Sequence, residues 1–247
     1  MTASMEEHEN LFAKIQEILG GTPGNLNILE DQIDMDLQVE YYECSRKMHT
    51  DVEEEWAIDH IQYLQEPGYS DDVKKAILAR LASIENVHCY RAIETYALRP
   101  DEGMRDWAIL ALNESRMHIE SKIMEENQVY ISTGLGGREH KLRYFVVLME
   151  RNRANLNETH QMVIRNEFDD VLGKFEAEIE KIEFSGYLAT ILLLLPMTYS
   201  LKQVFSKAIR ECNQYGEFLN DDFIVTNVKM LSFEEIRAFL ERKSKMD

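Results

Sequence analysis

The stretch YISTGLGGREHKLRYFVV, residues 130–147, separates two halves of the chain that differ in their pattern of apolar residues. Three glycines within four positions are followed by a group of basic residues: Arg138, His140, Lys141 and Arg143. A phosphate-binding loop needs a strand before it and a helix after it, because the helix N-terminus supplies free N–H groups. Here the continuously apolar run 142–149 follows, which is typical of a buried strand. The pattern therefore predicts a glycine hairpin turn between antiparallel strands at 128–133 and 141–149.

The basic residues after the glycines have two interpretations. Charged side chains discourage edge-to-edge pairing, so one role is to protect the edge of the following strand. They also form the one concentrated group of positive charge in an acidic sequence. That concentration makes Arg138 and Lys141 candidate residues of an anion-binding site.

Downstream of this stretch, strand-like and helix-like apolar spacings alternate. Asn157 opens a helix whose apolar stripe is predicted to continue to Ile182, and the short run Tyr187–Pro196, closed by a proline, is typical of a central strand. The elements that follow are a helix capped by Ser200, a strand at 223–231 and a last helix opened by a capping box of Ser232 and Glu235. Strands joined by helices favour parallel pairs, so we predict a four-stranded mixed sheet with the order ββαβαβα.

Upstream, the apolar positions recur at helical spacing, and two helices near 71–83 and 102–118 resemble each other. Shifting the first by 31 residues places its positions on those of the second: Val73 on Met104, Lys74 on Arg105, Ala76 on Trp107, Ile77 on Ala108 and Leu81 on Leu112. A period of this size is typical of helical repeat arrays, in which each unit buries its apolar face against its neighbours.

The stretch RPDEGMRDWAILAL, Arg99–Leu112, resembles the HEAT repeat, with Pro-Asp in the turn and an Arg early in the next helix. The resemblance covers about 55 residues and implies structural roles for Asp101 and Arg105 in bonds between neighbouring repeats. Together with the downstream pattern it predicts an α+β protein. A HEAT-like helical array at 1–126 would precede a small α/β domain at 127–247.

The negative charge is concentrated in the first half. Residues 1–126 carry 27 acidic and 11 basic residues, a balance of −16, whereas residues 127–247 carry 18 and 16, a balance of −2. Nucleic-acid binding depends on neutralising phosphates with Lys and Arg, so this charge argues against it for the first half. The N-terminus lacks the features of a signal peptide, no apolar run is long enough to span a bilayer, and the three cysteines form no CxxC motif. We therefore expect a cytoplasmic protein that binds neither membrane nor nucleic acid.

Titratable pairs at helical spacing are the remaining candidate sites. Glu85 and His88 are three residues apart, and Glu114 and His118 are four apart. A di-iron bundle needs the Glu-x-x-His motif twice together with two further glutamates, and the motif occurs once here. The sequence therefore predicts no metal site, no cofactor and no set of catalytic residues.

These observations favour a non-enzymatic protein-interaction or scaffold protein, whose acidic helical surface would bind a basic segment of a partner protein. The alternative is a ligand-binding or enzymatic C-terminal domain with an unidentified substrate, since open α/β sheets bind ligands beyond the carboxyl ends of parallel strands. The sequence leaves the oligomeric state open.

Overall fold

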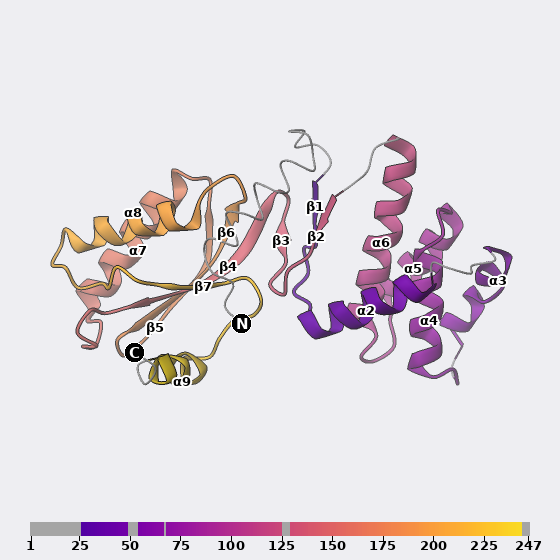
Figure 1. Ribbon diagram of the computed structural model, residues 1–247, viewed down its shortest axis with the longest axis horizontal. Coiled ribbons are helices and arrows are strands. Elements are labelled where there is room, and N and C mark those ends of the chain that lie inside the picture. Colours follow the sequence, from indigo (N-terminus) through magenta and orange to yellow (C-terminus); the bar gives the residue numbers. More distant parts are fainter. Residues whose placement is uncertain (1–25, 49–53, 67, 125–128, 244–247) are drawn as a thin grey trace. The chain divides into compact units, whose positions relative to one another are not determined.

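The computed structural model describes residues 26–48, 54–66, 68–124 and 129–243 (Figure 1). These residues divide into two compact units, one ending at Ile131 and the other beginning at Ser132. We call them the helical unit and, for the reason given below, the ferredoxin-like unit.

The helical unit is a bundle closed by a short parallel ladder. Its helices are α2 (Met35–Met48), α3 (Glu54–Asp59), α4 (Asp71–Ala82), α5 (Val87–Leu98) and α6 (Arg105–Met124), with a 3₁₀ turn η2 (Ile61–Leu64) after α3. The ladder pairs β1 (Leu26–Ile28) with β2 (Val129–Ile131) in parallel, so the two ends of the unit meet.

Large aromatic side chains occupy the centre of this bundle. Tyr41, Tyr96 and Trp107 are almost completely buried, and the rings of Tyr41 and Trp107 meet edge to face at 5.1 Å. The indole N–H of Trp107 donates to the carbonyl of Lys75 at 3.1 Å, so its polar atom is satisfied inside the core. The bundle is thereby held through α2, α4, α5 and α6.

The predicted HEAT-like repeat is wrong in its register. Val73 and Met104 should be equivalent at an offset of 31, but Val73 is 42% exposed and Met104 is 1% exposed. The buried positions 74, 77, 78 and 81 of α4 instead correspond to 104, 107, 108 and 111, an offset of 30. Upstream of α4, α2 is a long helix, but the described residues between α2 and α4 form a six-residue helix and a 3₁₀ turn rather than a second long helix. The similarity of the two sequences therefore does not reflect equivalent packing.

The second unit is built on an antiparallel sheet. Its elements are β3 (Gly137–Arg138), β4 (Lys141–Met149), α7 (Glu158–Gly173), β5 (Glu178–Ser185), β6 (Leu188–Pro196), α8 (Leu201–Asn213), β7 (Ile224–Thr226) and α9 (Phe233–Lys243). The sheet runs β7-β4-β6-β5, and every pair is antiparallel. The order β4-α7-β5-β6-α8-β7 is the β-α-β-β-α-β arrangement of ferredoxin-like folds.

Helices cover both faces of this sheet. α7 and α8 lie on one face and α9 lies on the other (Figure 1). Side chains alternate along β4, so Tyr144 and Val146 face α7 and α8 while Phe145 and Val147 pack in the cluster that contains Ile236 of α9. α9 begins with the predicted capping box, in which Ser232 and Glu235 exchange hydrogen bonds of 2.8 and 3.2 Å. The apolar run at 188–196 is the central strand that its sequence predicts.

The predicted ββαβαβα order with a mixed sheet is wrong, because α7 is shorter than its apolar stripe suggested. The helix ends at Gly173, and Ile179 and Ile182 belong to β5. A bulge between residues 179 and 181 places both isoleucines on the same face of that strand. Two apolar residues three apart on one strand face therefore imitate helical spacing.

The predicted glycine hairpin is also wrong. β2 pairs with β1 in the helical unit, and β4 pairs instead with β3 through a two-residue turn at Glu139 and His140. Gly134 serves close packing: a Cβ there would lie 1.8 Å from the carbonyl oxygen of Val228, and the adjacent Leu135 donates its N–H to the carbonyl of Asn227 at 2.9 Å. Gly136 has the positive φ, 65°, of a turn glycine. No helix follows the glycines, so the prediction against a phosphate-binding loop is confirmed.

Candidate anion-binding hairpin

The β3–β4 hairpin brings the two predicted anion-binding residues together. Arg138 and Lys141 are direct cross-strand partners on either side of the turn, and Glu139 adopts the positive φ of 55° that such a turn requires. Opposed side chains of an antiparallel pair lie on the same face within contact distance. The exposed His140 occupies the turn itself. The hairpin tip therefore presents two positive charges, the imidazole of His140 and the carboxylate of Glu139.

Both cations contact one acidic residue. The guanidinium of Arg138 and the ammonium of Lys141 donate to the two carboxylate oxygens of Glu178, on β5. The hydrogen bond from Lys141, reinforced by Arg138, holds the pKa of the Glu178 carboxyl below its usual range. Two cations share the carboxylate of Glu178, and Glu139 in the turn adds a second negative charge, so the charges of the hairpin are balanced.

The neighbouring ion pair of Arg143 and Glu180 is more deeply buried. Arg143 makes a bidentate contact with Glu180, with N–O distances of 2.6 and 3.0 Å, and its third nitrogen donates to the carbonyl of Leu135 at 2.7 Å. Its side chain is 12% exposed, compared with 49% for Arg138. Arg143 therefore stabilises the fold, whereas Arg138 is exposed to solvent.

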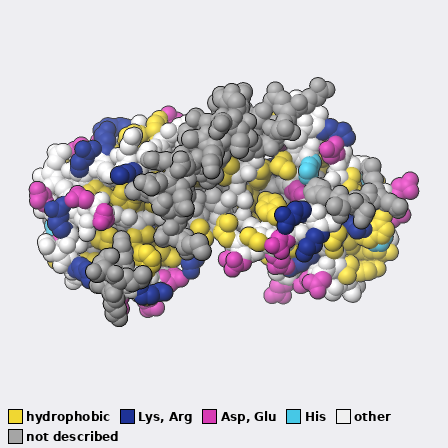
Figure 2. All heavy atoms as spheres, in the orientation of Figure 1, with side chains coloured by type: hydrophobic (Ala, Val, Ile, Leu, Met, Phe, Trp, Pro, Cys, Tyr) yellow, Lys and Arg dark blue, Asp and Glu magenta, His cyan; other side chains and the backbone are white. Residues whose placement is uncertain are grey.

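The register of the sheet explains why these charges meet. Arg143 lies opposite Leu194 of β6, and Glu178 of β5 lies opposite the same leucine from the other side. Bases on β4 and acids on β5 therefore share one sheet face and reach toward each other over the apolar surface of β6. On the face visible in Figure 2, Lys and Arg side chains of this unit lie among Asp and Glu side chains.

Glu178 and Glu180 are not among the residues predicted for this site, because the apolar stripe predicted for the helix opened by Asn157 continues through both positions. Charged residues alternating with isoleucines in EIEKIEFS are typical of a strand with one exposed face, and that signal was available.

The other predicted pairs do not form a reactive site. Glu85 contacts Lys122 of α6 at 3.3 Å, and His88 lines a depression beside η2. Glu114 is buried and accepts hydrogen bonds of 2.5 Å from Tyr41 and from Ser45, with His118 at 3.8 Å. This network joins α2 to α6. Within the residues that the structure describes, no three His, Cys, Asp or Glu side chains are grouped as metal ligands would be.

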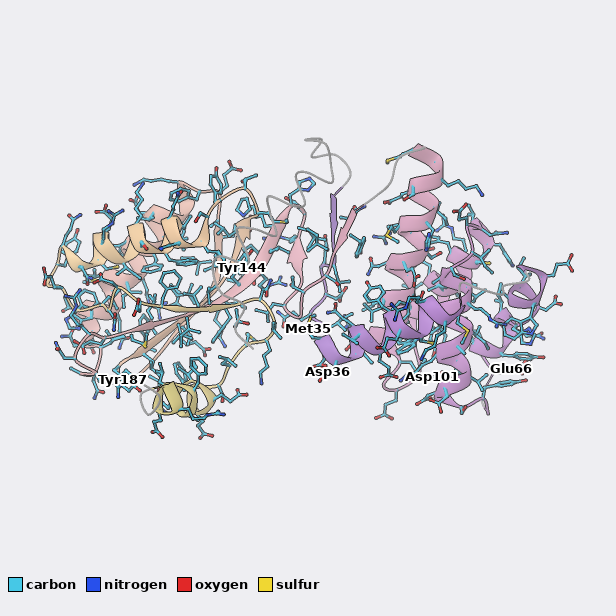
Figure 3. All side chains as sticks on the ribbon, in the orientation of Figure 1. Met35, Asp36, Glu66, Asp101, Tyr144 and Tyr187 are labelled. Atoms are coloured by element: carbon cyan, nitrogen blue, oxygen red, sulfur yellow. The ribbon has the colours of Figure 1, made fainter. Side chains whose placement is uncertain are left out.

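Asp101 and Arg105, which the HEAT resemblance assigned to bonds between repeats, make bonds within one bundle. Asp101 lies in the loop between α5 and α6 (Figure 3), where it accepts from Lys74 at 2.5 Å and from the Tyr96 hydroxyl at 2.8 Å. Arg105 pairs with Asp31 at 2.6 Å. Among the described helices, none is long and apolar enough to cross a membrane.

No family model and no curated protein sequence matches this chain. A putative transposase from Deinococcus radiodurans R1 matches 43% of this chain and 93% of its own length, with a TM-score of 0.35 and 16% identity. A REP-associated tyrosine transposase, solved bound to a REP hairpin, matches 42% of this chain and 67% of its own length, with a TM-score of 0.32 and 13% identity.

These neighbours are transposases and not helical-repeat proteins, and the HEAT resemblance is contradicted by the burial pattern of α4 and α6 described above. The acidic scaffold and the basic protein partner depended on that resemblance and are corrected with it, and the exclusion of nucleic acid for the whole chain is corrected as well. The charge argument against nucleic acid concerned the first half alone and does not extend to the ferredoxin-like unit. At these TM-scores, the activity of the neighbours is not carried over to this chain.

Proposed function

We propose that the ferredoxin-like unit binds the phosphate backbone of a single-stranded nucleic acid at the β3–β4 hairpin. The observation that carries this proposal is the sharing of one carboxylate, that of Glu178, by Arg138 and Lys141 at an exposed hairpin tip, which leaves further N–H donors on both cations. A phosphate oxygen offers these cations the same charge-assisted hydrogen bonds that the carboxylate now offers. The unit that holds the hairpin has nearly balanced charge, in contrast to the acidic helical unit.

The two cations would act differently. The guanidinium of Arg138 presents a planar fork that fits a phosphate with two hydrogen bonds, whereas the ammonium of Lys141 acts as a point charge. The bidentate pair of Arg143 with Glu180 keeps β4 and β5 in register beneath them. Binding of this kind reads the phosphate backbone and not the bases, so it has little sequence preference.

The first experiment measures the salt dependence of binding. Full-length protein is titrated into a fluorescently labelled single-stranded DNA of mixed sequence, and anisotropy is followed between 50 and 200 mM salt. Each phosphate contact on a single strand contributes a slope of roughly −0.7 to log K against log salt. We expect the double variant Arg138→Gln/Lys141→Gln to bind weakly and to reduce the slope by about 1.4, since two contacts are lost.

The matched control is Lys202→Gln/Arg210→Gln, which removes two exposed bases from α8 of the same unit. An equal loss in the control would show that net charge rather than the hairpin binds the strand. A parallel titration with inorganic phosphate separates the two sources of the anion. Binding of phosphate without binding of the strand contradicts the proposal, as does the absence of any binding at 50 mM salt.

Glu178→Gln should have the opposite effect. The substitution keeps the size of the side chain but removes the negative charge that competes with phosphate for Arg138 and Lys141. Because this charge lies within a few ångströms of the phosphate position and is screened by water, we expect its removal to raise strand affinity roughly fivefold. The same anisotropy titration measures it, with Glu183→Gln on the same strand as the control. Weaker binding by Glu178→Gln would mean that the carboxylate organises the site rather than competes for it.

A further inference from the structure

A cavity of about 240 Å³ lies in the helical unit between η2 and α5. Its apolar lining comes from Ile61, Leu64 and Ala92, and its polar lining includes His88, Arg91 and Thr95. An apolar lining with a few polar groups is the usual composition of a small-molecule site. The cavity is independent of the hairpin, because all its residues belong to the other unit.

The spacing of α5 places the polar groups on one side. His88, Arg91 and Thr95 are three and four residues apart, so they share a face of the helix, and Ala92 leaves space beside them. The helix is fixed at its start, where the side chain of Asn86 accepts a hydrogen bond of 2.7 Å from the N–H of His88. The polar groups are therefore held by a capped helix rather than by a loop.

An aromatic cluster borders the adjoining depression, which shares Ile61 and His88 with the cavity. His60 stacks on Trp56 at 3.8 Å and meets Tyr63 edge to face at 5.0 Å. Because a carbonyl oxygen can only accept, the 2.6 Å contact between Nδ1 of His60 and the carbonyl of Trp56 places a proton on Nδ1. This hydrogen bond and the stacking fix the wall of the depression in one arrangement.

The hydrogen-bonding groups around the cavity indicate the charge of its ligand. Arg91 donates through Nη1 to Glu94 at 2.5 Å, which raises the pKa of its guanidinium and uses only part of its donor set. The hydroxyl of Thr95 donates to the carbonyl of Arg91 at 2.7 Å. Nη2 of Arg91 and the ring of His88 remain as donors for an anionic group. The apolar lining suits a hydrocarbon body.

We propose that this cavity binds a small organic monocarboxylate, with its carboxylate at Arg91 and His88 and its apolar body against Ile61, Leu64 and Ala92. The volume equals about eight waters at roughly 30 Å³ each, so the ligand has about eight to ten non-hydrogen atoms. Benzoate has this size and charge, and it is the probe for the test. Benzamide has the same shape without the charge.

The test is calorimetric titration of the full-length protein with benzoate, benzamide and inorganic phosphate. Benzoate should bind in the millimolar range, and benzamide and phosphate should bind at least about tenfold more weakly, since each lacks either the charge or the apolar body. Arg91→Gln should weaken benzoate binding about tenfold, because one charge-assisted contact is lost. Thr95→Leu should abolish it by closing the rim, and this exposed position tolerates the change.

Two control variants locate the ligand. Arg99→Gln removes an exposed base from the end of α5, outside the cavity, and should leave binding unchanged. Arg116→Gln alters a neighbouring cavity of about 270 Å³ that Arg91 also lines. Loss of binding in Arg116→Gln but not in Thr95→Leu would place the ligand there and overturn the proposal. Equal affinity for benzoate and benzamide, or no binding of benzoate up to about 10 mM, would also overturn it.

Discussion

Gly134→Ala should unfold the ferredoxin-like unit while leaving the helical unit intact. The new Cβ would lie 1.8 Å from the carbonyl oxygen of Val228 and 2.7 Å from its carbonyl carbon. Both contacts are to backbone, so no side-chain rotation relieves them, and the segments at 133–136 and 226–228 must separate. We expect a loss of more than about 4 kcal/mol in the free energy of unfolding, above the roughly 1–3 kcal/mol that overpacking of a core usually costs, because backbone atoms cannot move aside as a side chain can.

The positions of the two tryptophans make this result measurable. Trp56 and Trp107 both lie in the helical unit, so tryptophan fluorescence reports that unit alone, whereas far-ultraviolet circular dichroism reports both. In Gly134→Ala, the dichroism should show an early transition in urea that the fluorescence does not follow. Gly173→Ala is the matched control, because a Cβ there meets no atom within 4 Å. If the two alanine variants unfold alike, the close approach of residues 134 and 228 is not a constraint on the fold.

Asp101→Ala should destabilise the helical unit, because it leaves the buried ammonium of Lys74 without its carboxylate partner. The side chain of Lys74 is 4% exposed, and its ammonium lies 2.5 Å from a carboxylate oxygen of Asp101. Removing one partner of a buried pair costs about 3–5 kcal/mol. Asp101 is 47% exposed, so water can partly replace it, and we expect a loss of about 2–3 kcal/mol. Urea unfolding followed by tryptophan fluorescence measures the change.

This destabilisation should depend on pH. The Lys74 ammonium, followed by the Tyr96 hydroxyl, holds the pKa of Asp101 below its usual range. A carboxyl with a lowered folded pKa stabilises the fold fully above its unfolded pKa, about 3.9, and loses that contribution as the pH falls through the folded value. The difference between wild type and Asp101→Ala should therefore be complete at pH 7 and shrink below about pH 4. The exposed neighbour Glu102, changed to alanine, should show no such difference, and a pH-independent effect of Asp101→Ala would exclude the ion pair as its cause.

Sequence patterns predict the correct elements where the interactions that form an element lie within one short segment. The capping box of Ser232 and Glu235 begins α9, and Asn157 and Ser200 cap α7 and α8. The apolar run at 188–196 forms the central strand. A strand buried on both faces is apolar at every position, so a short continuous apolar run predicts it directly. The strand after the glycines likewise excluded a phosphate-binding loop. In each case the deciding interactions join residues a few positions apart.

The failures concern contacts between distant residues. The bulge in β5 depends on its pairing with β6, and without it Ile179 and Ile182 have the spacing of a helix. The glycine at 134 is required by the backbone at 228, and the ion pairs of Arg138 and Lys141 depend on the order β4-β6-β5. The 31-residue similarity between α4 and α6 did not reveal that burial follows an offset of 30. Sheet order, strand register and close backbone approach arise when segments far apart in the chain pack together. The spacing of apolar residues within one segment therefore does not predict them.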